Sequence, residues 1–84
     1  MTNEQHRKAI DKLDSKIIQL LNERTTHALE IGANKLKAGE EIYAPHREKA
    51  LLKRLCSLNE GPIQNEAIMA IFREVMSSSL SLQK

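Results

Sequence analysis

Two basic side chains interrupt the apolar stripe of the first half of the sequence. Arg24 and Lys35 are eleven residues apart, a spacing within about 20° of three full helical turns, so both point in the same direction. His27 stands on the same stripe. Burying an unpaired guanidinium or ammonium group costs several kcal/mol, and Glu30, although close in sequence, lies on another face of the helix. The two cations therefore require either carboxylate partners from elsewhere or a cavity that receives an anion.

Polar side chains also continue the apolar stripes of two later segments. Ser79 and Gln83 are one helical turn apart and extend the stripe of the last segment. Arg47 and Glu48 open the middle segment, and leucines follow one turn after each of them, so at least one of the pair leans toward the core. We interpret these residues as the lining of one internal pocket for a dianion, with arginine for carboxylates, lysine as a point charge, and the others for neutral oxygens.

Each of these residues also has a simpler interpretation. Arg24 could snorkel to solvent or form an ion pair with another subunit, and Lys35 near a helix C-terminus complements the helix dipole. Glu48 in a first helical turn is ordinary charge placement, and Ser79 and Gln83 could belong to a fraying end. The agreement among separate segments favours the pocket.

The elements that must position these residues are three helices, which makes the chain all-α. Apolar residues recur at three- and four-residue spacing from Gln5 to about Lys37, with Thr2 or Asn3 available as N-cap. Pro45 starts a second helix that runs to about Leu58, with its leucines inward. The sequence NEGP then predicts a left-handed Gly61 and a third helix with Pro62 at its first position, carrying an apolar stripe to Leu82.

The first helix is too long for the chain that contains it. A helix of about 33 residues spans roughly 50 Å, whereas a compact chain of 84 residues has a radius of gyration of about 12 Å. The 84 residues make a single domain, residues 1–84, that alone buries only roughly 60% of its unfolded surface. We therefore expect a second copy of the chain to cover the apolar stripe in a homodimer.

Composition removes several classes of function. Lys and Arg number 13 against 11 acidic residues, for a net charge of +2, and only Tyr43 and Phe72 are aromatic, so nucleic acid is not an expected partner. His27 and His46 lack metal-ligand spacing with any Cys or Asp, so no metal is expected. Cys56 is the only cysteine, and neither a signal peptide nor an 18-residue apolar run is present. These features favour a cytoplasmic protein that does not enter a membrane.

Four segments, in this order and spacing, resemble the all-helical chorismate mutase family. The resemblance covers nearly the whole chain, from about Arg7 to Gln83, and the segments are IDKLDSKIIQLLNER, IGANKLK, REKALLKRL and SSSLSLQ. LNEGP and FREVMSSSL also resemble the mutase portion of bifunctional chorismate mutase–prephenate dehydratases. The resemblance implies an intertwined homodimer of three-helix chains with two equivalent sites, no cofactor, and chorismate as the small-molecule substrate.

The resemblance also implies roles for the cations and the amide. Arg24 and the Arg7 contributed by the partner chain would clamp the two substrate carboxylates. Lys35 would contact a carboxylate and the ether oxygen of the breaking bond, and Gln83 would donate to that oxygen from the opposite side. Lys35, Gln83, Arg24 and, at the ring, Glu48 are thus the expected catalytic residues.

The remaining family positions would complete the pocket. Glu48 would accept a hydrogen bond from the ring hydroxyl, while Arg47 and Ser79 would support the wall and the carboxylates. Many relatives of the family carry an acidic residue at the position of Ala44, near the same hydroxyl. Its absence leaves Glu48 as the main side-chain acceptor and bears on affinity more than on activity.

The implied reaction, chorismate to prephenate in phenylalanine and tyrosine biosynthesis, suits these residue types. It is a Claisen rearrangement that needs no nucleophile, metal or general base, so a catalyst has to hold a near-attack conformer and stabilise charge on the ether oxygen. Two alternatives remain: an isochorismate pyruvate lyase on the same scaffold, and a non-catalytic helical dimerisation module. Lys84 ends the chain where the bifunctional relatives continue, so the sequence leaves open whether the chain is complete or an excised domain.

Overall fold

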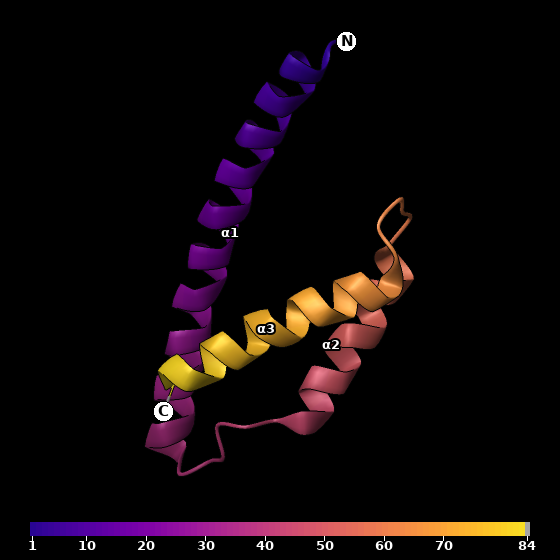
Figure 1. Ribbon diagram of the computed structural model, residues 1–84. Coiled ribbons are helices and arrows are strands. Elements are labelled where there is room, and N and C mark those ends of the chain that lie inside the picture. Colours follow the sequence, from indigo (N-terminus) through magenta and orange to yellow (C-terminus); the bar gives the residue numbers. More distant parts are fainter. Residues whose placement is uncertain (84) are drawn as a thin grey trace.

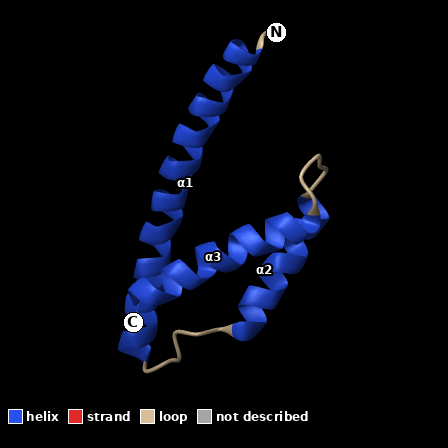
Figure 2. Ribbon diagram, in the orientation of Figure 1, coloured by secondary structure: helices blue, strands red, loops and turns tan. Residues whose placement is uncertain are grey.

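The computed structural model describes residues 1–83 and confirms the all-α prediction. The chain forms α1 (Asn3–Ala38), α2 (Pro45–Leu58) and α3 (Asn65–Gln83), and the described residues contain no strand (Figure 2). The three helices match the three predicted segments in order and in type. They agree in bounds to within two residues, except at the start of α3.

α1 has a defined cap at each end. At the N-terminus, the backbone N–H of Gln5 donates to Thr2 Oγ1 at 3.2 Å, and the Thr2 N–H donates to Gln5 Oε1 at 2.8 Å, which forms a capping box. At the C-terminus, Gly39 adopts the left-handed conformation at φ 69°, and the Glu40 N–H donates to the Lys35 carbonyl at 2.8 Å. The 36 residues between these caps correspond to about 54 Å of uninterrupted helix.

The start of α3 differs from the prediction. Pro62 is not the first helical residue, because α3 begins at Asn65. The Asn59 side chain spans the connection: its Nδ2 donates to the Ile63 carbonyl and to Asn65 Oδ1, both at 2.8 Å, and its Oδ1 accepts from the Gly61 N–H at 3.0 Å. Gly61 is left-handed as expected, at φ 76°, but it lies two residues beyond the cap of α2. These side-chain bonds hold the segment in a turn and delay the helix.

α3 is the element that joins the structure together. It crosses from α2 to the C-terminal half of α1 and contacts both helices (Figure 1). The small core lies along α3, where Leu51 and Met76 are buried. Leu58 was expected to point inward but is 61% exposed, because it sits in the last turn of α2 and no other side chain within residues 1–83 covers it. The N-terminal half of α1 extends away from the other helices.

A single chain leaves the apolar face of α1 uncovered. The solvent-accessible surface area of the chain is 7025 Å², whereas a compact monomer of this mass would expose about 5,000 Å². The radius of gyration is 15.8 Å, against about 12 Å for a compact chain of this length. Four residues of the predicted stripe in the first part of this helix are more than half exposed: Ile10, Leu13, Ile17 and Leu20. None of the helices described in residues 1–83 has the length and apolar character that a membrane span requires.

Candidate active site

A single cavity collects almost all of the side chains that the sequence singles out. It has a volume of about 260 Å³ and is bounded by the C-terminal half of α1, the start of α2 and the end of α3. This volume lies just below the range of about 300–1,000 Å³ that is typical of small-molecule sites. Six of the seven predicted site residues line it: Arg24, Lys35, Arg47, Glu48, Ser79 and Gln83.

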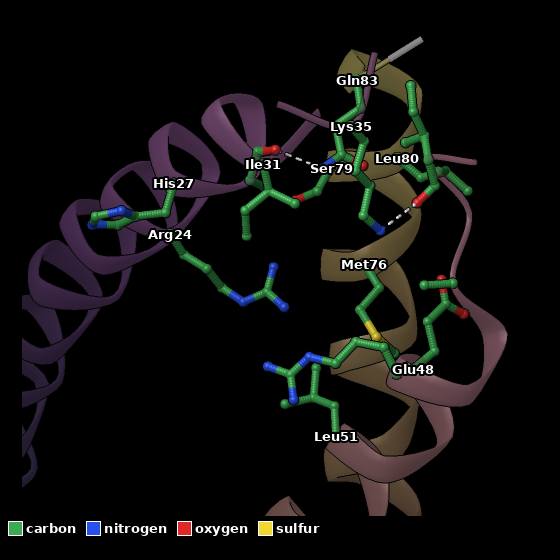
Figure 3. A pocket seen from close by; sticks show the side chains of 14 residues that line it. Arg24, His27, Ile31, Lys35, Glu48, Leu51, Met76, Ser79, Leu80 and Gln83 are labelled. Carbon is green, nitrogen blue, oxygen red and sulfur yellow. Dashed lines mark hydrogen bonds between the residues drawn. The ribbon is translucent and has the colours of Figure 1, made fainter. Parts of the chain in front are cut away.

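The cations of α1 face the cavity as their spacing predicted. Arg24 is half-buried, and its guanidinium points into the space between α1 and α2 (Figure 3). Lys35, also half-buried, donates from Nζ to the main-chain carbonyl of Ile42 at 3.3 Å. That neutral partner fixes the ammonium group without cancelling its charge. The lysine therefore keeps further N–H groups available to a ligand.

The charge of the lining residues suits an anionic ligand. Arg24, Lys35 and Arg47 contribute three positive charges, and Glu48 is the only acidic residue among them. These four side chains alone leave the lining within residues 1–83 with two uncompensated positive charges. Such an excess favours a dianion, because a ligand of that charge removes the mutual repulsion of the cations.

Ser79 presents a hydroxyl that the protein does not use. Its side chain is 5% exposed, and Oγ has no hydrogen-bond partner within residues 1–83. The neighbouring Ser78 shows the usual alternative, since its Oγ donates to the Val75 carbonyl at 3.1 Å. A buried hydroxyl without a partner costs about 1–3 kcal/mol, so Ser79 is available to a ligand in the cavity that it lines.

Gln83 is held in place by α1. Its Nε2 donates to the main-chain carbonyl of Ala28 at 2.6 Å (dashed in Figure 3), which joins the last residue of α3 to the opposite helix. Gln83 is half-buried, and the interpretation of Ser79 and Gln83 as a fraying end is therefore wrong. The amide uses one N–H for this bond and retains a second.

The first turn of α2 supplies the opposite wall. Glu48 is half-buried, whereas Arg47 is exposed at the edge. The Glu48 N–H donates to the Ala44 carbonyl at 3.1 Å, and Ala44 makes no side-chain cap although it occupies the N-cap position. Pro45 at the first helical position starts the helix at this point and so places Glu48 one turn into it, beside the cavity.

Arg7 does not belong to the cavity of its own chain. It lies seventeen residues before Arg24 on the same helix, which corresponds to about 25 Å along the axis. Its side chain is exposed. The N-terminal half of α1 extends away from the other helices (Figure 1). The prediction that Arg7 acts in a site therefore requires the site of another chain.

Sequence reasoning missed part of the lining. His27, which was not among the predicted site residues, is exposed but also lines the cavity beside Arg24 (Figure 3). Apolar residues of the same helical stripes also line the cavity, and the helical periodicity of the sequence could have identified them. They are Ala28, Ile31, Leu51, Met76 and Leu80, and Ile42 joins them from the segment between α1 and α2. Within residues 1–83, no group of three or more His, Cys, Asp or Glu side chains is arranged to hold a metal ion.

Comparisons with known proteins agree on one family. Residues 6–84 match the family model described as chorismate mutase type II. The bifunctional chorismate mutase/prephenate dehydratase of Neisseria gonorrhoeae is 47% identical over 79 residues, which cover 94% of this chain and 21% of that protein. The chain thus spans about a fifth of the length of such bifunctional relatives.

Two solved structures have the same fold. The structure of chorismate mutase (Form II) from Thermus thermophilus superimposes with a TM-score of 0.93 at 35% identity, over 95% of this chain and 91% of that one. Chorismate mutase from Helicobacter pylori in complex with prephenate gives a TM-score of 0.85 at 34% identity, over 95% and 87% of the two chains.

Proposed function

This chain belongs to the chorismate mutase type II family, and from that premise we propose that it converts chorismate to prephenate. The observation that carries the proposal is the cavity in which six predicted side chains from three helices meet. The reaction is an intramolecular rearrangement, so the protein has to bind, orient and stabilise charge. Cations and neutral hydrogen-bond donors are sufficient for those tasks.

The charge of the cavity supports chorismate as the substrate. Chorismate carries two carboxylates, and the excess of positive charge in the lining favours such a dianion. In our proposal Arg24 binds one carboxylate through two parallel N–H groups, and Arg47 and the unpartnered Ser79 hydroxyl support the carboxylates from the wall. Glu48 accepts a hydrogen bond from the ring hydroxyl. Holding both ends of the molecule favours the conformer in which the enolpyruvyl arm lies over the ring.

Lys35 and Gln83 supply the electrostatic part of the catalysis. The ether oxygen gains negative charge as its bond to the ring breaks. The Lys35 ammonium group and the second N–H of Gln83 approach it from opposite sides, both held by main-chain carbonyls at their other contacts. Groups that are already fixed need no reorganisation during the reaction, and removing one such donor in other enzymes costs about 10²–10³ in rate.

The active species in this proposal is a homodimer in which Arg7 enters the partner's cavity. Two separate chains would expose twice 7025 Å², whereas a compact protein of twice the mass exposes about 8,400 Å². Pairing the uncovered faces of α1 would thus remove roughly 5,700 Å² from solvent, an area typical of obligate dimers. An antiparallel pairing of the two α1 helices would carry Arg7 across the distance that separates it from Arg24 in its own chain.

The direct test is prephenate formation from chorismate by the purified 84-residue chain. We expect turnover by the wild-type protein and a large loss in the Arg24→Ala variant, with both proteins folded by circular dichroism. Following pyruvate release from isochorismate in parallel tests the lyase alternative, which Glu48, placed for the ring hydroxyl of chorismate, disfavours. A folded dimer that forms no prephenate would refute the proposed function, and pyruvate release as the main activity would identify the lyase.

A further inference from the structure

Gly32 lies where the end of α3 packs closely against α1. It is the buried residue of α1, and a Cβ built on it would lie 2.9 Å from Gln83 Cγ and 3.1 Å from Gln83 Cβ. Real Cβ atoms essentially never make contacts below 3.0 Å. The Gln83 side chain can therefore occupy its observed position against α1 only because residue 32 has no side chain.

The absence of a side chain at this position also exposes a main-chain acceptor. In an α-helix the carbonyl of residue 28 accepts the N–H of residue 32, and a side chain at 32 would lie back over the turn that contains that carbonyl. Gly32 leaves the surface of α1 open there. The second lone pair of the Ala28 carbonyl can then accept the Gln83 Nε2 hydrogen bond at 2.6 Å.

This hydrogen bond decides which end of the amide faces the ligand. A carbonyl oxygen attracts the amide nitrogen of Gln83 and repels its oxygen, so the Ala28 carbonyl selects one of the two amide orientations. One N–H is used in the bond, and the other remains for the cavity that Gln83 lines. In the opposite orientation, Gln83 would present an oxygen to a ligand oxygen that is becoming negative.

We propose that Gly32 is a positioning residue for Gln83: it opens α1 so that the amide docks on the Ala28 carbonyl and directs its second N–H to the reacting oxygen. The inference rests on the proposed function for its effect on rate. The docking itself concerns only this chain, and it can be observed without substrate.

The test is Gly32→Ala, with Asn34→Ala as the matched control. Both changes raise intrinsic helix propensity in α1, but Asn34 is exposed and lies outside the cavity. We expect the kcat of Asn34→Ala to stay within about twofold of wild type, because a change in helix propensity alone does not move the side chains of the site. For Gly32→Ala we expect kcat to fall at least about tenfold, up to the 10²–10³ typical of losing one such donor, with a smaller change in KM.

A double variant separates positioning from a general structural effect. If Gly32→Ala acts by displacing the Gln83 amide, it should lower kcat by less than about threefold in a Gln83→Ala background, because the two changes share one cause. An equally large loss in both backgrounds, or a Gly32→Ala variant as active as wild type, would overturn the inference. If Gly32→Ala does not fold, recovery of the fold in the double variant would support the close contact, and failure of both to fold would overturn it.

A substrate-free measurement keeps this inference distinct from the proposed function. In ¹⁵N-labelled wild-type protein, the Gln83 side-chain amide should show two well-separated proton resonances, one of them shifted by the bond to Ala28. In Gly32→Ala the two should move toward ordinary solvent-exposed values, and an unchanged pair would refute the docking. If the wild-type chain had no mutase activity, the proposed function would be refuted, and the spectrum alone would still decide whether Gln83 docks on Ala28.

Discussion

Replacing Gln83 by glutamate changes the donor capacity of residue 83 while keeping its shape. The wild-type amide has two N–H groups: one binds the Ala28 carbonyl at 2.6 Å, and the other is assigned to the ether oxygen. An ionised carboxylate has none, and it would place a negative oxygen against both the Ala28 carbonyl and the ether oxygen. The Gln83→Glu variant should therefore be impaired wherever the new carboxyl group is ionised.

The size of the defect follows from the protonated fraction. A free glutamate has a pKa near 4.3, so at a pH of about 7.5 only about one carboxyl in 1,600 carries its proton, and we expect a loss on the order of 10³ in kcat/KM. The Ala28 carbonyl raises the pKa of the introduced carboxyl, and the cations of the cavity lower it. A net change of one pH unit in the pKa of this carboxyl alters the expected loss in kcat/KM about tenfold.

The assay is kcat/KM against pH for wild type, Gln83→Glu and Gln83→Ala, with circular dichroism at each pH. Activity of the glutamate variant should rise up to about tenfold for each unit of falling pH, because the protonated form is the active one. Its plateau should remain below wild type, since a single O–H cannot serve the Ala28 carbonyl and the ether oxygen together. The amide and alanine proteins should show no such rise.

One result would refute this reasoning. If Gln83→Glu were as active as wild type at a pH of about 7.5 with a flat profile, residue 83 would not contact the ether oxygen. The assignment of Ser79 and Gln83 to the substrate pocket would then have to be abandoned. A rise with falling pH shared by Gln83→Ala would instead place the titrating group elsewhere in the site.

Three other perturbations test the shared site, the interface and the buried hydroxyl. Arg7→Ala and Arg24→Ala should each be nearly inactive. After subunit exchange, about half of the dimers contain one chain of each variant and have one intact site, so the mixture should recover about a quarter of the wild-type number of active sites. If no activity returns after verified exchange, Arg7 does not act in the partner's site. Leu20→Ala should lower the free energy of unfolding by about 2–5 kcal/mol if the partner buries this side chain. The unfolding midpoint of the wild type should rise with protein concentration, whereas a constant midpoint would indicate a self-sufficient monomer. Ser79→Ala should raise the free energy of unfolding by about 1 kcal/mol, because Oγ has no partner, and should raise KM for chorismate; lower stability with unchanged KM would contradict its assignment to the ligand.

Local features of the molecule could be predicted because they depend on neighbouring residues. The spacing of apolar side chains defined the helices, the Thr2 cap began α1, and Pro45 began α2. The common direction of Arg24 and Lys35 follows from helix geometry alone, which has 3.6 residues per turn whatever surrounds it. The excess length of α1 likewise indicates a partner chain from the sequence alone.

Other features depend on contacts between distant segments, and only the tertiary structure decided them. The side chain of Asn59 delays α3 to Asn65, a network that the helical signal of Pro62 does not reveal. The approach of α3 to Gly32 brings Gln83 to α1 across 55 residues of sequence. Periodicity gives the direction of a side chain around its own helix but not the position or crossing of another helix. The contents of the cavity are set by that crossing.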